Sequence, residues 1–413
     1  MGKKLIKLSL LFLITINLFL IPNLNQKIAT KSLLDPNQHS YWPTKGWKTS
    51  SPEAQGMDSS VLNLTSTYIS ENNLPVDSII VIRHGYLVYE EYPRMYLFNE
   101  NTKHLLYSVT KSFSSALIGI ALDNDYIQSI QDKIVSFFPE YTITNPDARK
   151  YEITIEHLLK MRSGFEWDES TYPILDSRND VMKLIQSDDS IQFLLDRSLY
   201  YDPNQGWHYN TGDSHLLSAI IQSQTNQTTL DFAQDHLFNP LGISNVYWSA
   251  DKLGINYGGF DLSLLPRDMA KFGYLYLNKG NWDGTQIIPT QWIENSIFSH
   301  TTINSRTGYG YQFWISKNLD YYYAAGLYGQ KIMIIPDQDM VVVFTANFQG
   351  SDNAEEVILS NYVLNSVTNS YSLNNSSFTN STGEIKTTDV SIWFPGLFVI
   401  VLFSLTKKKI NKD

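Results

Sequence analysis

The placement of the strand-like segments constrains the fold of this chain most strongly. Five segments alternate or cluster apolar residues in the manner of β-strands: 77–83, 86–92, 321–326, 331–336 and 340–348. A turn at His84-Gly85 joins the first two, and residues 337–339 join the last two. Because strands lie at both ends of the globular body and helices lie between them, the two ends are predicted to complete one antiparallel sheet.

Helical periodicity is clearest in the middle of the body. The helical segments there are residues 108–123, 154–161, 213–224 and 266–277, and two more lie at 58–71 and 354–366. We therefore expect an α/β (α+β) protein in which helices flank the antiparallel sheet. The middle of the chain is expected to form an inserted, mostly helical lobe. The body is expected to be one domain over residues 45–367.

Both ends of the chain indicate membranes. Residues 1–30 join a basic head to an apolar run, which is typical of a secretory signal peptide or an N-terminal membrane anchor. Residues 368–388 are rich in Ser, Thr and Asn and read as a flexible stalk. Residues 389–413 close an apolar run with three lysines, which predicts a transmembrane segment with a cytoplasmic basic tail. A buried C-terminal helix is the alternative. The body is expected to be secreted or held at the cell surface.

Composition excludes several classes of function. The formal charge of −10, with no basic stripe in the body, argues against a nucleic-acid partner. The absence of cysteine excludes disulfides and a thiol nucleophile. His208 and His215 lie near one another in sequence, but no carboxylate-histidine spacing accompanies them. We expect no metal and no cofactor.

Ser108 and Lys111 stand at the start of an apolar helix, in the stretch LLYSVTKSFSSALIGIALD. A spacing of three puts both side chains on one helical face, near the positive end of the helix dipole. Burial against the apolar run would lower the pKa of Lys111 and let its amine accept the serine proton. A capping serine beside a solvated lysine is the alternative, since Ser249/Lys252 and Ser404/Lys407 repeat the spacing.

Two later segments could complete an acyl-transfer site. Tyr209 lies on an aromatic loop just before the helix at Gly212, and a phenol near an ammonium can shuttle protons. In AAGLYGQ (residues 324–330), two glycines allow a close backbone approach, and an exposed N–H there could pair with that of Ser108 to hold an oxyanion. Taken singly, each has a structural explanation: a packed tyrosine and a glycine hairpin.

In this order the three pieces resemble the serine β-lactamase and penicillin-binding-protein superfamily. The chain looks most like the branch of class C β-lactamases, D-aminopeptidases, carboxylesterases and 6-aminohexanoate-dimer hydrolases. The resemblance covers about residues 50–367. It includes SPEAQGMDSSVL, VIRHGYLVYEEY, TIEHLLKMRSGFEWDE, LLPRDMAKFGYLYLNKGNWDGTQII and YGYQFWI. It implies a β-lactamase/transpeptidase-like fold.

The resemblance also implies roles for single residues. Ser108 is the acylated nucleophile, and Lys111 and Tyr209 handle its proton. The oxyanion hole uses the backbone N–H groups of Ser108 and Leu327. The triplet 324–326 matches the Lys-Thr-Gly motif of the edge strand.

Two positions depart from the family pattern. Thr211 occupies the third position of the Tyr-x-Asn motif, although Asn210 is adjacent. Ala324 stands where relatives carry a lysine or histidine that helps to hold a substrate carboxylate. The alanine argues against penicillins and against peptides with a free carboxylate. The residues expected to contact substrate are Gly326, Ala324, Thr211, Trp167 and Tyr328.

Other side chains near these motifs admit two interpretations. By resemblance, Glu166, Asp168 and Glu169 border the mouth of the active site, although a solvated loop is equally compatible with the sequence. Trp207 and Tyr172 could make the site apolar, or they could pack in the core.

The predicted function is that of a serine hydrolase that cleaves an ester or amide bond through an acyl-enzyme. The alternatives are a cell-wall D,D-peptidase or β-lactamase, and a catalytically inactive surface-binding pseudoenzyme. The sequence leaves open which of Lys111 and Tyr209 is the main base.

Overall fold

The main sheet joins the two ends of the body, as the sequence predicts. The computed structural model describes residues 41–348 and 353–368. Within these residues the sheet has eight antiparallel strands in the order β2-β1-β13-β12-β11-β10-β9-β8. The strands are β1 (Val76–Arg83), β2 (Tyr86–Glu91), β8 (Thr301–Thr302), β9 (Thr307–Tyr309), β10 (Trp314–Ser316), β11 (Tyr321–Gly326), β12 (Gln330–Ile335) and β13 (Met340–Ala346). Because β1 pairs with β13, the predicted closure of the sheet by both ends is confirmed.

The first hairpin follows from its turn residues. His84 and Gly85 both have positive φ, 49° and 79°. This conformation matches the right-handed twist of two strands joined by a two-residue loop. Ile80 of β1 faces Val343 of β13 in the register. All eight residues of β1 are buried, because helices cover both faces of the sheet.

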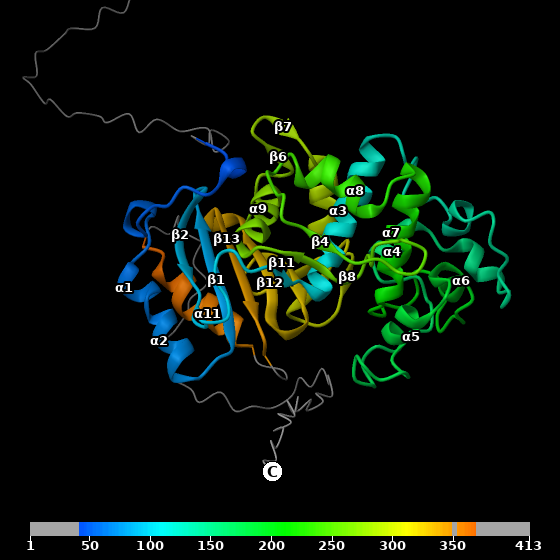
Figure 1. Ribbon diagram of the computed structural model, residues 1–413, viewed down its shortest axis with the longest axis horizontal. Helices are drawn as coiled ribbons and strands as arrows, with labels where there is room; N and C mark the ends of the chain where they lie inside the picture. The colour runs from blue at the N-terminus through cyan, green and yellow to red at the C-terminus, as the bar shows by residue number, and fades with distance from the viewer. Residues whose placement is uncertain (1–40, 349–352, 369–413) are drawn as a thin grey trace, which may run out of the picture. The chain divides into compact units, whose positions relative to one another are not determined.

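Two apolar cores lie on opposite faces of the sheet. Helices α1 (Ser59–Leu62), α2 (Leu64–Glu71) and α11 (Ala354–Ile358) cover one face, and α3 (Thr110–Asp123) and α9 (Pro266–Leu277) cover the other (Figure 1). Alternation along β1 assigns its side chains accordingly: Ile79 and Val81 pack with α1, and Ile80 and Ile82 pack with α3.

The expected helical lobe lies beyond α3 (Figure 1). It contains α4 (Ile155–Leu159), α5 (Asp180–Gln186), α6 (Ser190–Leu195), α7 (Thr211–Thr225) and α8 (Thr229–Ala233). α3 is buried over nearly its whole length because it packs against both the sheet and the lobe. A second sheet of β3 (His104–Leu105), β5 (Leu262–Leu264) and β4 (Tyr247–Trp248) leads the chain into α3.

Smaller elements complete the body. A hairpin pairs β6 (Asn281–Trp282) with β7 (Thr285–Gln286), and α10 (Thr290–Ile297) follows it. The predicted leader and transmembrane segment, and all but the first residue of the stalk, lie outside the described residues. Within residues 41–348 and 353–368, no helix has both the length and the apolar character needed to cross a membrane.

Candidate active site

Ser108 lies in a tight turn that redirects the chain from β3 into α3. Residues 107–109 form a single 3-10 turn, and Tyr107 adopts a positive φ of 48°. Such a conformation is uncommon outside glycine, and it persists only where the surroundings enforce it. The N–H of Leu106 donates to the carbonyl of Leu262, which fixes the approach to the turn. Ser108 is partly exposed while the residues that follow it are buried, so its hydroxyl is accessible at the start of α3.

Lys111 is buried among three oxygen atoms. Its Nζ lies 2.9 Å from Ser108 Oγ, 3.0 Å from Thr211 Oγ1 and 2.9 Å from the carbonyl oxygen of Gly259. Lys111 as a whole is 2% exposed to solvent. A Cβ at position 259 would lie 2.7 Å from the Thr211 methyl group, so the carbonyl reaches Lys111 only because residue 259 is glycine. The amine is therefore held in one place, directly against the Ser108 hydroxyl.

The pKa shifts of Lys111 and Tyr209 favour Lys111 over Tyr209 as the base. Burial lowers the pKa of Lys111 to about 8, and the carboxylate of Glu169 acts in the opposite direction. A neutral amine can donate to two of its neighbours and use its lone pair to accept the Ser108 proton. Burial raises the pKa of Tyr209 above its ordinary value, so its phenol stays protonated near neutral pH.

Tyr209 lies on the loop before α7, close to Ser108 and Lys111. The Ser108 side chain is near enough to act on its phenol, where it lowers the pKa against the larger effect of burial, and Lys111 Nζ lies 4.8 Å from the centre of its ring. The ring stacks on Trp314 of β10, with centroids 5.9 Å apart, and contacts Trp207 at 6.3 Å. This aromatic packing orients the phenol toward Ser108.

The end of β11 lies against the turn that carries Ser108. A Cβ built on Gly326 would lie 2.2 Å from the carbonyl oxygen of Leu106 and 3.2 Å from the backbone nitrogen of Ser108. Only glycine allows this approach, which brings the N–H groups of Ser108 and Leu327 onto adjoining segments. Leu327 is 37% exposed, so this side of the site is open to a substrate.

An aromatic pair ties the same two segments together. The rings of Tyr107 and Tyr328 meet edge to face with centroids 5.2 Å apart. Tyr328 has a positive φ of 64°, so both members of the pair have the strained backbone that flanks a predicted oxyanion donor.

The remaining predicted site residues occupy different environments. Thr211 contacts Lys111 from the third position of the tyrosine motif. Ala324 is 1% exposed and packs in the same apolar core as Val109. Trp167 is also 1% exposed and fills space beside Gly212 in the lobe. The structure therefore places the Trp167 ring in the core and not on an open wall of the site.

The two histidines considered as metal ligands have separate partners. His208 Nε2 contacts the carbonyl oxygen of Trp167. His215 is buried inside the lobe, where its Nε2 lies 3.0 Å from Asp251 and 3.1 Å from Ser190.

Two contributors to the site were not singled out from the sequence: the carbonyl oxygen of Gly259 and the Trp314 ring. Glu169 was expected only at the mouth of the site, and the structure adds that its carboxylate accepts the Thr211 N–H at 2.9 Å. The signals available were a Gly-Gly pair at 258–259, the aromatic segment 309–315 and the acidic residues after the turn at 162–164. None of these signals indicates which distant residue it meets.

Comparison with known proteins identifies the family. The beta-lactamase family model matches residues 53–361, about three quarters of the chain. The chain belongs to the beta-lactamase family. This confirms the resemblance inferred from the three motifs.

Individual relatives are distant in sequence. The chain is 22% identical over 301 residues to a 6-aminohexanoate-dimer hydrolase from Paenarthrobacter ureafaciens, which covers 67% of this chain and 74% of that protein. It is 22% identical over 179 residues to protein flp from Staphylococcus aureus (strain MW2), 42% of this chain and 34% of that protein. The chain thus spans only about a third of the length of protein flp.

Solved structures share the fold. The octameric penicillin-binding protein homologue from Pyrococcus abyssi superposes with a TM-score of 0.60 at 19% identity, covering 74% of this chain and 77% of that one. At this identity the likeness establishes the β-lactamase/transpeptidase-like fold alone.

Proposed function

We propose that the chain is a serine hydrolase that cleaves an ester or amide bond through an acyl-enzyme on Ser108. The observation that carries the proposal is the 2.9 Å contact between Lys111 Nζ and Ser108 Oγ, with the amine buried and its pKa lowered to about 8. A structural lysine has no need of a partly exposed serine as its partner. Membership of the beta-lactamase family and similarity to a protein named as a hydrolase support the same reaction.

The chemistry follows from the geometry of the site. Ser108 Oγ attacks the substrate carbonyl carbon while its proton moves to Lys111 Nζ. The substrate carbonyl oxygen gains a negative charge, which the backbone N–H groups of Ser108 and Leu327 stabilise. The proton then passes through the Tyr209 phenol to the leaving alcohol or amine, and the carbonyl–leaving group bond breaks. In the second half, Lys111 takes a proton from water as the water attacks the acyl carbon. The bond between the acyl carbon and Ser108 Oγ then breaks, the acid departs, and Ser108 Oγ takes the proton from Lys111.

The surroundings favour substrates with a neutral, apolar acyl end. Ala324 offers no cation to a substrate carboxylate at its place on β11. Trp314 and Trp207 surround Tyr209 with aromatic surface. Esters and amides of uncharged acids therefore fit this site better than penicillins or peptides that end in a carboxylate.

A panel of p-nitrophenyl esters and anilides tests the proposal with the purified body. The wild-type protein is expected to hydrolyse esters of short neutral acids and to leave nitrocefin intact. Ser108→Ala is expected to abolish turnover while the unfolding temperature stays unchanged. Equal turnover by the two proteins would refute the assignment of Ser108, and rapid nitrocefin hydrolysis would favour the β-lactamase alternative.

We also propose that the body acts outside the cell and is held to the membrane by its terminal segments. The basic head and apolar run of residues 1–30, and the apolar run with three lysines in residues 389–413, support this location. Protease added to intact cells is expected to cut the body, and a body protected until the cells are lysed would refute the location.

A further inference from the structure

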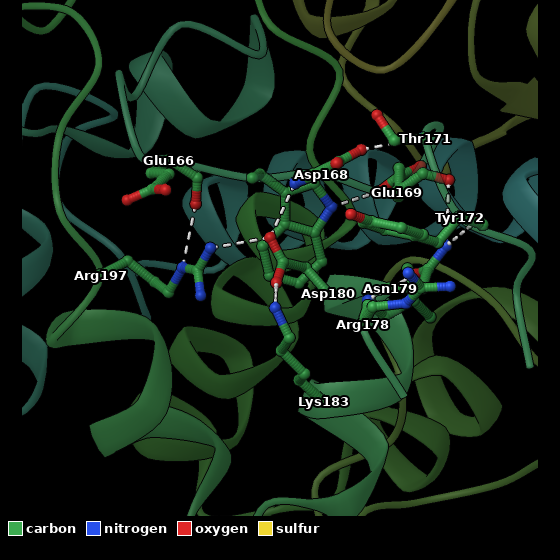
Figure 2. A network of polar contacts seen from close by, with 12 residues as sticks. Glu166, Asp168, Glu169, Thr171, Tyr172, Arg178, Asn179, Asp180, Lys183 and Arg197 are labelled. Carbon is green, nitrogen blue, oxygen red and sulfur yellow. Dashed lines mark hydrogen bonds and ion pairs between the residues drawn. The ribbon is translucent and has the colours of Figure 1, made fainter. Parts of the chain in front are cut away.

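Glu169 lies on a segment that buried polar side chains fix in place (Figure 2). The side-chain amide of Asn179 donates to the carbonyl oxygens of Glu169 at 3.2 Å and Tyr172 at 2.8 Å. The Asp180 carboxylate accepts the backbone N–H of Asp168 at 2.7 Å. Asn179 and Asp180 are 0% and 1% exposed. The main chain on both sides of Glu169 is therefore anchored.

The charge of Asp180 is balanced inside this network. Arg197 pairs with Asp180 at 2.7 Å, and Lys183 pairs with it at 2.8 Å (Figure 2). Arg197 also donates to the carbonyl oxygen of Glu166 at 2.9 Å. In contrast, within the part of the chain that the structure describes, Glu169 forms no ion pair with a cationic side chain.

The Glu169 carboxylate is directed at the catalytic centre. Its Oε2 accepts the backbone N–H of Thr211 at 2.9 Å and the indole N–H of Trp167. The hydroxyl of that same Thr211 contacts Lys111 Nζ at 3.0 Å. A single residue thus separates the carboxylate from the amine. The Trp167 ring is buried, so the carboxylate oxygen has a fixed direction.

We propose that Glu169 is a positioning residue of this centre, which holds Thr211 against Lys111 and supplies the negative charge that keeps the amine a strong base. This role rests on the proposed hydrolase function. A deeply buried lysine without a nearby anion gives up its proton easily but binds the serine proton weakly. The negative charge of Glu169 restores part of the proton affinity that burial removes from Lys111. The two groups do not form a direct ion pair, because Thr211 lies between them.

Burial acts on the other titratable groups of this region in one direction. Burial raises the pKa of the Tyr209 and Tyr309 phenols, and burial raises the pKa of Asp213 well above its ordinary value. Glu169 is the group whose charge raises the pKa of Lys111. Neutralising Glu169 is therefore expected to move the titration of Lys111 to lower pH.

The pH dependence of Ser108 labelling by a fluorophosphonate tests the proposal without assuming a substrate. The rate is expected to rise with pH through an apparent pKa of about 8 in the wild-type protein. In Glu169→Gln the labelling rate is expected to rise about 1 pH unit lower, because Lys111 then titrates without a nearby negative charge. Glu169→Asp keeps the charge and should leave the rise close to its wild-type position.

The controls separate this role from others. Glu166→Gln removes a carboxylate on the same segment whose side-chain contact is with Tyr200, and it should leave the profile unchanged. If Glu169→Gln slows labelling equally at every pH, Glu169 is merely structural and the proposal fails. If Glu169→Gln does not fold, the Glu169→Asp variant decides. A labelling rate that rises about 1 pH unit lower in Glu169→Asp than in the wild-type protein would also overturn the proposal, because this variant keeps the charge. Failure of the wild-type protein to label would instead refute the hydrolase function itself.

Discussion

Gly326→Ala tests the expected geometry of the oxyanion hole. The added methyl carbon would lie 2.2 Å from the carbonyl oxygen of Leu106 and 3.2 Å from the nitrogen of Ser108. The first distance must open by about 1 Å to reach an ordinary contact, and a displacement of that size in a reacting group can cost about a hundredfold in rate. Loss of one oxyanion donor costs about 10²–10³ in kcat, or roughly 2.7–4 kcal/mol. We therefore expect kcat to fall by about 10²–10³, with a smaller change in KM.

The assay measures kcat and KM for p-nitrophenyl butyrate, with the unfolding temperature recorded for each protein. Ala325→Ser is the matched control, because strand alternation points this neighbour to the opposite face of β11. The control is expected to retain kcat. If Gly326→Ala folds normally and keeps kcat within about threefold of wild type, the oxyanion hole does not lie between β11 and the Ser108 turn.

Three further predictions follow from the site. Because Lys111 must be neutral to accept a proton and its pKa is lowered to about 8, kcat/KM should rise with pH through about 8. A profile that is flat from pH 6 to 9, or that falls, would contradict Lys111 as the base. Tyr209→Phe should lower kcat by about 10²–10⁴ without lowering the unfolding temperature, and an unchanged kcat would exclude the phenol from proton transfer. Trp167→Ala should reduce the free energy of unfolding by about 3–5 kcal/mol, as measured by denaturant titration, because its ring is buried in the lobe. A normal stability with a raised KM would instead support the expectation that Trp167 contacts substrate.

The sheet and the main helices were predictable because their patterns are local. The strands β1 and β13 contain continuous apolar runs at residues 79–82 and 340–344, and the two-residue turn at 84–85 is visible in the sequence. The strands β8, β9 and β10 were not predicted, because segments of two or three residues carry no recognisable periodicity.

The site was predictable to the extent that its parts are close in sequence. Ser108 and Lys111 are three residues apart, so helical geometry alone places them on one face. Gly259 lies 148 residues from the Lys111 that it contacts, and Glu169 lies 42 residues from Thr211. Loops bring these partners together, and no local pattern specifies where a loop ends in space.

Two expectations change once packing is known. The family resemblance implied that Trp167 lines a pocket, because its segment borders the mouth of the active site; in the structure its ring is buried in the lobe beside Gly212. The sequence left the choice of base open. The contrast between a lowered pKa at Lys111 and a raised pKa at Tyr209 now favours the lysine, and burial produces both shifts.

The most direct test of the central claim is the intact mass of the protein during ester hydrolysis. Rapid acid quenching of the wild-type protein with p-nitrophenyl butyrate is expected to trap a butyryl adduct, and peptide mapping should place it on Ser108. Ser108→Ala should show no adduct under the same conditions. Turnover without any adduct on Ser108, or an adduct that persists in Ser108→Ala, would contradict the acyl-enzyme account.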